Sequence, residues 1–222
     1  ALVIKSITNA CINSGCALLG GETAEMPGHY IDNNFDLAGF SVGCVDEKKI
    51  LNNENVKIGN VLLGIESSGP HSNGFSLIRK IINDSKAPKN EIKEMVNKAL
   101  MPTILYPSLI IDLIKNFSIN SISHITGGGL LENLPRSIPK NLSIEINTNS
   151  WEMPKIFRWL QDEGNVPQDE MYRIFNCGIG MVLFVDEKDS SEIRDKILEK
   201  NYKCFEIGKV CKNKSDNQIE FI

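Results

Sequence analysis

The stretch VLLGIESSGPHSNGFSLIRKIIND, Val61–Asp84, decides the fold. It begins with an apolar run, Val61–Ile65, that is typical of a buried strand. A polar loop, Glu66–Asn73, follows, and Gly74–Asp84 then has the apolar spacing of a helix. A strand, a glycine-containing loop and a helix therefore stand in direct succession, which is typical of a mixed fold.

The same alternation of strands and helices continues to the end of the chain. Further strands are expected at 121–125, 142–146, 179–185, 205–210 and 218–222. Helices are expected at 109–114, 130–134, 154–163 and 190–200, with one more short helix inside 85–103. Pro135 and Pro139 should cut the second of these helices short, and Asp189 or Ser190 is placed to cap the last one. The sequence thus predicts an α/β or α+β fold.

The N-terminal part has a pattern of its own. Apolar residues at three- and four-residue spacing within 2–11 predict a helix, which Gly15 is placed to end. Cys16–Leu19 and Phe35–Val45 are expected to be strands. The polar segment Asp46–Lys57 then marks the boundary between two structural units, residues 1–50 and residues 51–222.

Composition excludes several classes of protein. Of the 222 residues, 41% are hydrophobic and 23% charged, which is ordinary for a globular protein. A run of about 18 apolar residues, the length of a membrane span, is absent from the sequence. The net charge of −4 argues against a nucleic-acid-binding face. The six cysteines lack C-x-x-C spacing, so we expect buried, reduced thiols in a cytoplasmic protein rather than disulfides or a zinc site.

Loop 1, GGETAEMPG at Gly20–Gly28, is the first of three glycine-rich turns. Paired glycines let main-chain N–H groups approach a ligand oxygen closely. Glu22 and Glu25 are candidate Mg²⁺ ligands, because this cation prefers carboxylates together with phosphate oxygens. The alternative is structural: the two carboxylates stand at a helix N-terminus, where the helix dipole favours them.

Loop 2, SSGPHSNG at Ser67–Gly74, brings hydroxyls, an amide and an imidazole together at a strand end. Such a position before a helix suits an anionic substrate such as a phosphate ester. His71 is the histidine best placed for proton transfer near neutral pH. The alternative is an ordinary turn in which Ser72 or Asn73 caps the following helix.

Loop 3, HITGGG at His124–Gly129, carries three successive glycines. Close approach of the main chain to a phosphate would require them, and so would a tight structural turn. The run is not a dinucleotide fingerprint, because Glu132 stands where the third glycine of G-x-G-x-x-G belongs, and the sequence holds no Walker loop. Outside the three loops, Trp151 and Trp159 are expected in the core, and His29 is expected to have an exposed or structural role.

Taken in order, these motifs resemble phosphoribosylformylglycinamidine cyclo-ligase, also called aminoimidazole ribonucleotide synthetase. The resemblance is carried by the three loops and continues through segments 151–161, 164–166 and 170–181. It covers essentially the whole chain. Members of this family have an additional N-terminal region, so the resemblance implies that residues 1–50 are what remains of an ATP-binding and dimerisation domain and that residues 51–222 are a complete C-terminal domain.

The resemblance also implies an activity and a set of partners. The family uses ATP and Mg²⁺ to convert formylglycinamidine ribonucleotide into aminoimidazole ribonucleotide, ADP and phosphate, a step of purine biosynthesis. Its members are cytoplasmic homodimers with a small-molecule substrate, and neither nucleic acid nor a membrane is expected as a partner. The 222-residue chain by itself is expected to be inactive.

The family's functional residues carry over by motif. His71 becomes the candidate catalytic residue. The residues expected to bind substrate are Ser68, Gly69, Ser72, Asn73, Gly74, Thr126, Gly127, Gly128, Gly129 and Asn176. The residues expected on the ATP side are Gly20, Gly21, Glu22 and Thr23, with Glu22 and Glu25 as metal ligands. Two alternatives stay open: a domain that binds a phosphorylated ligand without turnover, and a related ATP-using enzyme such as formylglycinamidine ribonucleotide synthetase.

Overall fold

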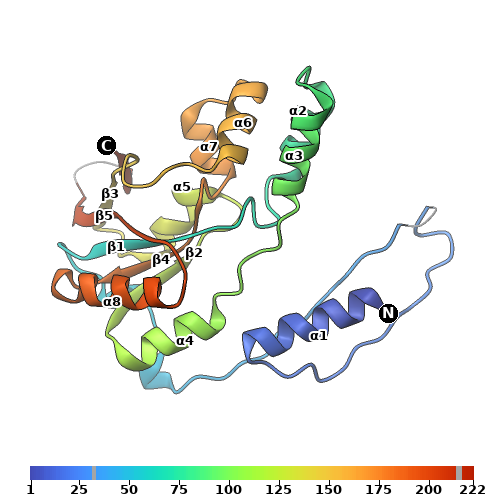
Figure 1. Cartoon of the computed structure of the whole chain (residues 1–222). Helices are drawn as coiled ribbons and strands as arrows, with labels where there is room; N and C mark the ends of the chain where they lie inside the picture. Colours follow the sequence, from blue (N-terminus) through green and yellow to red (C-terminus); the bar gives the residue numbers. More distant parts are fainter. Residues whose placement is uncertain (32–33, 214–216) are drawn as a thin grey trace. The chain divides into compact units, whose positions relative to one another are not determined.

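The structure, a computed structural model, describes residues 1–31, 34–213 and 217–222. It separates into two compact units, Ala1–Ile50 and Leu51–Ile222, here called the first and the second unit (Figure 1). The division falls inside the polar segment 46–57. That the first unit derives from an ATP-binding and dimerisation domain stays a prediction.

The first unit contains one long helix. Helix α1 (Leu2–Ser14) ends where Gly15 adopts a left-handed conformation with φ 71°, and Cys16 N–H then closes the turn by donating to Cys11 O at 3.0 Å. The predicted helix and its glycine stop are confirmed. A short 3₁₀ turn, η1 (Glu47–Lys49), lies near the end of the unit.

The two strands predicted in the first unit are wrong. The segments 16–19 and 35–45 have no regular secondary structure, and the side chain of Phe40 is 100% exposed. A strand needs a neighbouring strand to satisfy its main-chain N–H and C=O groups. The described part of the first unit offers these segments no such neighbour.

The second unit is built on a six-stranded sheet of order β2-β4-β1-β5-β3-β6. Its strands are β1 (Val61–Glu66), β2 (Ile119–His124), β3 (Leu142–Ile146), β4 (Ile179–Val185), β5 (Cys204–Lys212) and β6 (Ile219–Phe221). Neighbouring strands are antiparallel except β3 and β6, which are parallel. The mixed fold is confirmed, and the mostly antiparallel pairing makes it the α+β rather than the classical parallel α/β type.

Helices cover both faces of this sheet. They are α2 (Phe75–Asp84), α3 (Lys89–Ala99), α4 (Pro107–Asn116), α5 (Gly129–Asn133), α6 (Lys155–Gly164), α7 (Gln168–Ile174) and α8 (Glu187–Glu199), with 3₁₀ turns η2 (Asn53–Asn55) and η3 (Leu134–Ser137). Figure 1 shows α4 and α8 on one side and α5, α6 and α7 on the other. Successive residues of a strand point to opposite faces, so Leu62 packs with the α5–α7 side and Leu63 with the α4 and α8 side.

One carboxylate joins three strands at one end of the sheet. Asp186 follows β4, and its Oδ1 accepts hydrogen bonds from Asn60 Nδ2 at 2.9 Å and Asn120 Nδ2 at 2.8 Å. These asparagines lie at the starts of β1 and β2. The predicted cap of the last helix is wrong, because α8 begins three residues earlier than expected and Asp186 stands at its N-cap position.

The remaining local predictions concern the end of α5, two tryptophans, the cysteines and membrane spans. Helix α5 ends at Asn133, and a 3₁₀ turn containing Pro135 follows it, so the early stop is confirmed. Trp151 and Trp159 are core residues, as expected. The expectation of burial is wrong for four of the six cysteines: only Cys177 and Cys204 are buried. Within the described residues, each helix is too short or too polar to cross a bilayer.

Candidate functional site

Loops 2 and 3 meet at one end of the sheet. Strand β4 pairs with β1 on one side and with β2 on the other, both antiparallel, so the ends of β1 and β2 lie beside the start of β4. Loop 2 leaves the end of β1 and loop 3 leaves the end of β2. A Cβ placed on Gly127 of loop 3 would lie 3.5 Å from Asn73 Oδ1 of loop 2. The strand order therefore brings two of the three predicted loops close together.

Asn176 fastens loop 2 to the segment that leads into β4. Its Oδ1 accepts from Ser67 Oγ at 2.7 Å and from Gly178 N–H at 2.9 Å, and its Nδ2 donates to Gly69 O at 2.8 Å. The side chain is 2% exposed. A buried amide with all these partners holds a loop in one conformation. In this structure Asn176 orients loop 2 from behind.

His71 is held by its own loop and by Ile104. Its Nε2 lies 3.0 Å from Ser68 N, 3.0 Å from Ser68 Oγ and 3.4 Å from Ile104 N. A main-chain N–H can only donate, so Nε2 accepts, and the neutral ring carries its proton on Nδ1. That Nδ1 is buried and has no hydrogen-bond partner among the described residues.

The imidazole of His71 is neutral at pH 7. Burial, and secondly the charge of His124, lower the pKa of His71 to about 4. With its basic nitrogen engaged by Ser68, the ring is set to donate from Nδ1 rather than to accept a proton. Acceptance of a proton at Nε2 would require loop 2 to release that nitrogen, so the catalytic role of His71 stays a prediction.

Tyr106 lies between the two histidines of the site. Its ring centroid is 6.1 Å from that of His71 and 6.0 Å from that of His124, and its Oη donates to Glu66 O at 2.7 Å. Burial raises the pKa of the Tyr106 hydroxyl, so it stays protonated. A Cβ on Gly180 would lie 2.1 Å from Tyr106 Oη. The sequence analysis missed Tyr106, which has no signal beyond an aromatic residue before a helix.

The structural alternative for loop 2 is confirmed as a turn, in which Asn73 N–H donates to Pro70 O at 3.1 Å, but its predicted helix cap is wrong. Neither Ser72 nor Asn73 caps α2: the N-cap residue is Gly74, and Asn73 Nδ2 donates to His71 O at 2.8 Å instead. Gly74 has φ 71°, and a Cβ there would lie 2.3 Å from Phe175 Cε1. His71 and Ser72 also have positive φ, 50° and 61°, which side-chain-bearing residues rarely adopt. Loop 2 is a strained turn, and strain of this kind is common at ligand sites.

The glycines of loop 3 have a packing reason. Gly128 and Gly129 have φ 94° and 54°, and a Cβ on Gly129 would lie 2.1 Å from Tyr172 O of α7. Loop 3 therefore needs glycine to approach α7 so closely. This supports the structural alternative for Gly129. It says nothing against phosphate contact by the rest of the loop, which stays a prediction.

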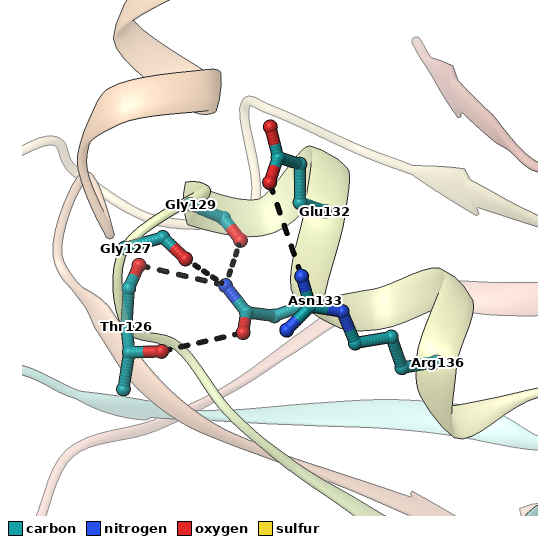
Figure 2. A network of polar contacts seen from close by, with 6 residues as sticks. All are labelled: Thr126, Gly127, Gly129, Glu132, Asn133 and Arg136. Carbon is teal, nitrogen blue, oxygen red and sulfur yellow. Dashed lines mark hydrogen bonds and ion pairs between the residues drawn. The ribbon is translucent and has the colours of Figure 1, made fainter.

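Asn133 organises loop 3 from inside, as Figure 2 shows. Its Nδ2 lies 3.4 Å from Thr126 O, 3.2 Å from Gly127 O and 2.8 Å from Gly129 O. Its Oδ1 accepts from Thr126 Oγ1 at 3.3 Å. The side chain is 6% exposed. Asn133 was missed in the sequence, although an amide at the end of a short helix, between Leu130–Leu131 and Leu134, was a usable signal.

Loop 1 lies in the first unit, and its predicted setting is wrong in both versions. No strand precedes it and no helix follows it: Gly20, Gly21, Glu22, Thr23 and Glu25 lie in an exposed segment without regular structure. A Cβ on Gly20 or Gly21 would meet no atom within 4 Å. In the described residues no group of three or more His, Cys, Asp or Glu side chains could hold a metal ion. Glu22 and Glu25 supply the donor type that Mg²⁺ prefers, but no cage is built around them.

A pocket of about 590 Å³ lies elsewhere in the second unit. Its lining residues are Thr148, Asn149, Trp151, Met153, Gln168, Asp169, Tyr172, Phe221 and Ile222. Phe221 stacks on Tyr172 with ring centroids 4.4 Å apart. The pocket includes none of the predicted site residues, so it does not coincide with the meeting point of loops 2 and 3.

Comparison with known families gives a match over most of the second unit. The family described as "AIR synthase related protein, C-terminal domain" matches residues 57–218. The chain belongs to the AIR synthase family. The match spans loops 2 and 3, Asn133 and Asn176, and the family resemblance expected from the motifs is confirmed.

Curated relatives within the AIR synthase family share one name. The protein named phosphoribosylformylglycinamidine cyclo-ligase in Geobacter metallireducens is 49% identical over 96% of this chain and 63% of its own length. The protein of the same name in Geotalea uraniireducens is 45% identical over 100% of this chain and 66% of its own length. The chain thus spans slightly less than two thirds of the relatives it matches.

Solved structures support the AIR synthase fold. Thiamine-monophosphate kinase from Stenotrophomonas maltophilia superposes with a TM-score of 0.54 at 13% identity, over 80% of this chain and 54% of that one. The E. coli hydrogenase maturation protein HypE gives a TM-score of 0.54 at 13% identity, over 78% of this chain and 48% of that one. At such low identity these likenesses concern the fold alone.

Proposed function

We propose that this chain carries the ribonucleotide-binding part of an ATP-dependent phosphoribosylformylglycinamidine cyclo-ligase. The observation that carries the proposal is 49% identity, over 96% of the chain, to a relative of that name. The proximity of loops 2 and 3 supports it, because the two loops assigned to the ribonucleotide lie side by side in the second unit.

The proposed reaction has two steps. The γ-phosphoryl group of ATP is transferred to the formyl oxygen of formylglycinamidine ribonucleotide, and ADP is released. The amidine nitrogen then attacks the activated carbon, a carbon–nitrogen bond closes the imidazole ring, and the phosphorylated oxygen departs as phosphate. Phosphoryl transfer of this kind depends chiefly on positioning and on stabilising negative charge.

In this proposal the residues of loops 2 and 3 bind and orient the ribonucleotide. The donors are the hydroxyl of Ser72, the amide of Asn73 and the main chain of Thr126–Gly129 apart from the Gly129 N–H, which donates to Thr126 O. Ser68 Oγ donates to Pro102 O at 2.6 Å, so its oxygen takes part as an acceptor. Neutral His71 contributes a buried Nδ1–H, and proton transfer by His71 remains part of the proposal. Asn176 keeps loop 2 in place by the hydrogen bonds described above.

The ATP side of the reaction is assigned to loop 1. Gly20, Gly21, Glu22 and Thr23 are proposed to face the nucleotide, and Glu22 with Glu25 to contribute carboxylates for Mg²⁺. When bound, Mg²⁺ would neutralise charge on the phosphates. A homodimer and a cytoplasmic location complete the proposal. Both are carried over from the family resemblance.

Calorimetry on the 222-residue chain tests the ribonucleotide assignment. Formylglycinamidine ribonucleotide should bind at a single site, and Asn73→Ala should weaken binding about tenfold, since a hydrogen bond to a charged group is typically worth about 1.5–3 kcal/mol. Asn149→Ala, in the separate pocket, is the matched control and should bind as the wild type does. Absence of ribonucleotide binding, or equal loss in both variants, contradicts the assignment.

A phosphate-release assay separates catalysis from binding alone. Release that requires both ATP and the ribonucleotide identifies a cyclo-ligase. Ribonucleotide binding without release by this chain supports the alternative of a binding domain, and release with a different ribonucleotide supports a related ATP-using enzyme.

A further inference from the structure

We propose that Asn133 is a positioning residue, which turns the main-chain N–H groups of Gly127 and Gly128 outward toward the substrate phosphate. The inference rests on the proposed function, which assigns loop 3 to phosphate contact. It adds how that loop obtains a donor-lined surface, and it names a residue that the motifs did not single out.

Three main-chain carbonyls surround the side-chain amide of Asn133. Asn133 Nδ2 lies within 3.4 Å of the carbonyl oxygens of Thr126, Gly127 and Gly129. Figure 2 shows that these oxygens converge on the same nitrogen. In a planar trans peptide the C=O and the following N–H point in opposite directions. When these carbonyls face inward, the next N–H group along the chain faces outward in each case.

Of these N–H groups, those of Gly127 and Gly128 belong to exposed and half-buried residues, whereas Leu130 is fully buried. Within the described part of the chain, no main-chain acceptor receives a hydrogen bond from Gly127 or Gly128. Gly129 provides an internal contrast, because its N–H donates to Thr126 O at 3.0 Å. Loop 3 therefore has two amides available to a ligand and one that is engaged internally.

The side chain of Asn133 serves this loop alone. It is 6% exposed, and its neighbours Leu130 and Leu134 in the same segment are fully buried. A buried amide in such surroundings is costly unless it is hydrogen-bonded, and every hydrogen bond recorded for this side chain goes to residues 126, 127 or 129. Packing alone would favour leucine here, so the amide is explained by the loop.

A charged side chain, that of Glu132, lies next to loop 3 and allows a second test. Glu132 lies over Gly128: a Cβ there would be 2.7 Å from Glu132 Oε2. Arg136 Nη2 lies 3.9 Å from the same oxygen and offsets part of its charge. An anion approaching the Gly128 N–H meets this carboxylate, so Glu132→Gln should tighten phosphate binding, whereas loss of the Asn133 donor should weaken it.

The first experiment uses the unmodified chain. Ribose 5-phosphate is titrated into the ¹⁵N-labelled protein, and the amide resonances of loop 3 are followed. The largest shifts are expected at Gly127 and Gly128, with a much smaller shift at Gly129. In the free protein the Gly129 amide should also exchange with solvent more slowly than the other two.

The second experiment compares variants. Asn133→Asp keeps the shape but puts an oxygen where three carbonyls need a donor, so ribose 5-phosphate should bind about tenfold more weakly. Leu142→Ala is a stability control: Leu142 is 5% exposed in β3, which three strands separate from β2. At temperatures where each variant is folded, this control should retain wild-type affinity even if its melting temperature falls as far.

The outcomes separate the inference from the proposed function. Ribose 5-phosphate binding with loop 3 amides unmoved contradicts the phosphate assignment itself. Binding in which Gly129 shifts as much as its neighbours, or Asn133→Asp with wild-type affinity, overturns the role of Asn133 and leaves the proposed function standing. If Asn133→Asp does not fold, the shift pattern of the unmodified chain decides.

Discussion

Similar apolar sequences form a strand in the second unit of this chain but no regular structure in the first. Phe35–Val45 in the first unit and Ile179–Val185 in the second both predict strands. Ile179–Val185 is the fully buried strand β4, paired on both sides, whereas Phe35–Val45 has no regular structure and Phe40 is fully exposed. An apolar run becomes a strand only where other strands satisfy its main chain and other side chains cover it.

The largest expected effect contrasts two phenylalanines. Phe157 is fully buried in the second unit, so Phe157→Ala should lower the free energy of unfolding by about 3–5 kcal/mol. Phe40→Ala, at the exposed position in the first unit, should change it by less than about 0.5 kcal/mol. Urea unfolding followed by circular dichroism measures both. A large loss from Phe40→Ala would show that the first unit has a core of its own in solution.

Glycines give the next contrast. Gly129→Ala places a Cβ 2.1 Å from Tyr172 O at a positive φ, and we expect a loss of about 2–4 kcal/mol. Gly21→Ala meets open space and should leave the unfolding free energy unchanged. The same unfolding assay applies. Equal stability of the two variants would contradict the close packing of loop 3 on α7.

Histidine titration provides a third contrast. The pKa of His71 is lowered from 6.5 to about 4 by burial and by His124, so between these pH values the unfolded chain binds a proton that the folded chain does not. Stability from this group is therefore complete above about pH 6.5 and falls as the pH drops toward 4. His71→Gln should remove that part of the pH dependence. Unfolding curves across pH 4–8 test it.

The smallest effect concerns surface contacts. Lys155 Nζ lies 3.0 Å from Glu94 Oε1, and both side chains are about half exposed. Glu94→Gln should cost about 0.2–1 kcal/mol, less at high salt. In the first unit Tyr30 donates to Asp36 on an exposed surface, and Asp36→Asn should leave the cooperative transition of the second unit in place. Thermal melts at low and high salt give the comparison.

Much of the second unit could be predicted because its segments obey local rules. The bounds of β3 and β4 agree with the predicted strands at 142–146 and 179–185, where alternation or continuous apolarity is clear. Helix α7 was missed: its sequence QDEMYRI is short and mostly polar, and it is stabilised by packing on α5 rather than by its own pattern. The strands expected in the first unit failed because periodicity does not report whether a partner strand is present.

The candidate site was predicted in its parts but not in its connections. The glycines and polar side chains of loops 2 and 3 stand out by residue type alone. That Asn176 ties down loop 2, that Tyr106 lies between two histidines, and that Asn133 gathers three carbonyls all depend on residues distant in sequence or on main-chain direction. The tautomer of His71 likewise follows from two main-chain donors, at Ser68 and Ile104, which no motif encodes.

Asp186 has a consequence for how the site can move. The carboxylate bridges the starts of β1 and β2 at the end of β4, while loops 2 and 3 occupy the far ends of the same strands. The three strands are therefore tethered to one another at this end of the sheet. Sliding one strand past another would break a charge-assisted hydrogen bond to Asp186. When a ligand binds, we therefore expect peptide groups of loops 2 and 3 to rotate while the strand register stays unchanged.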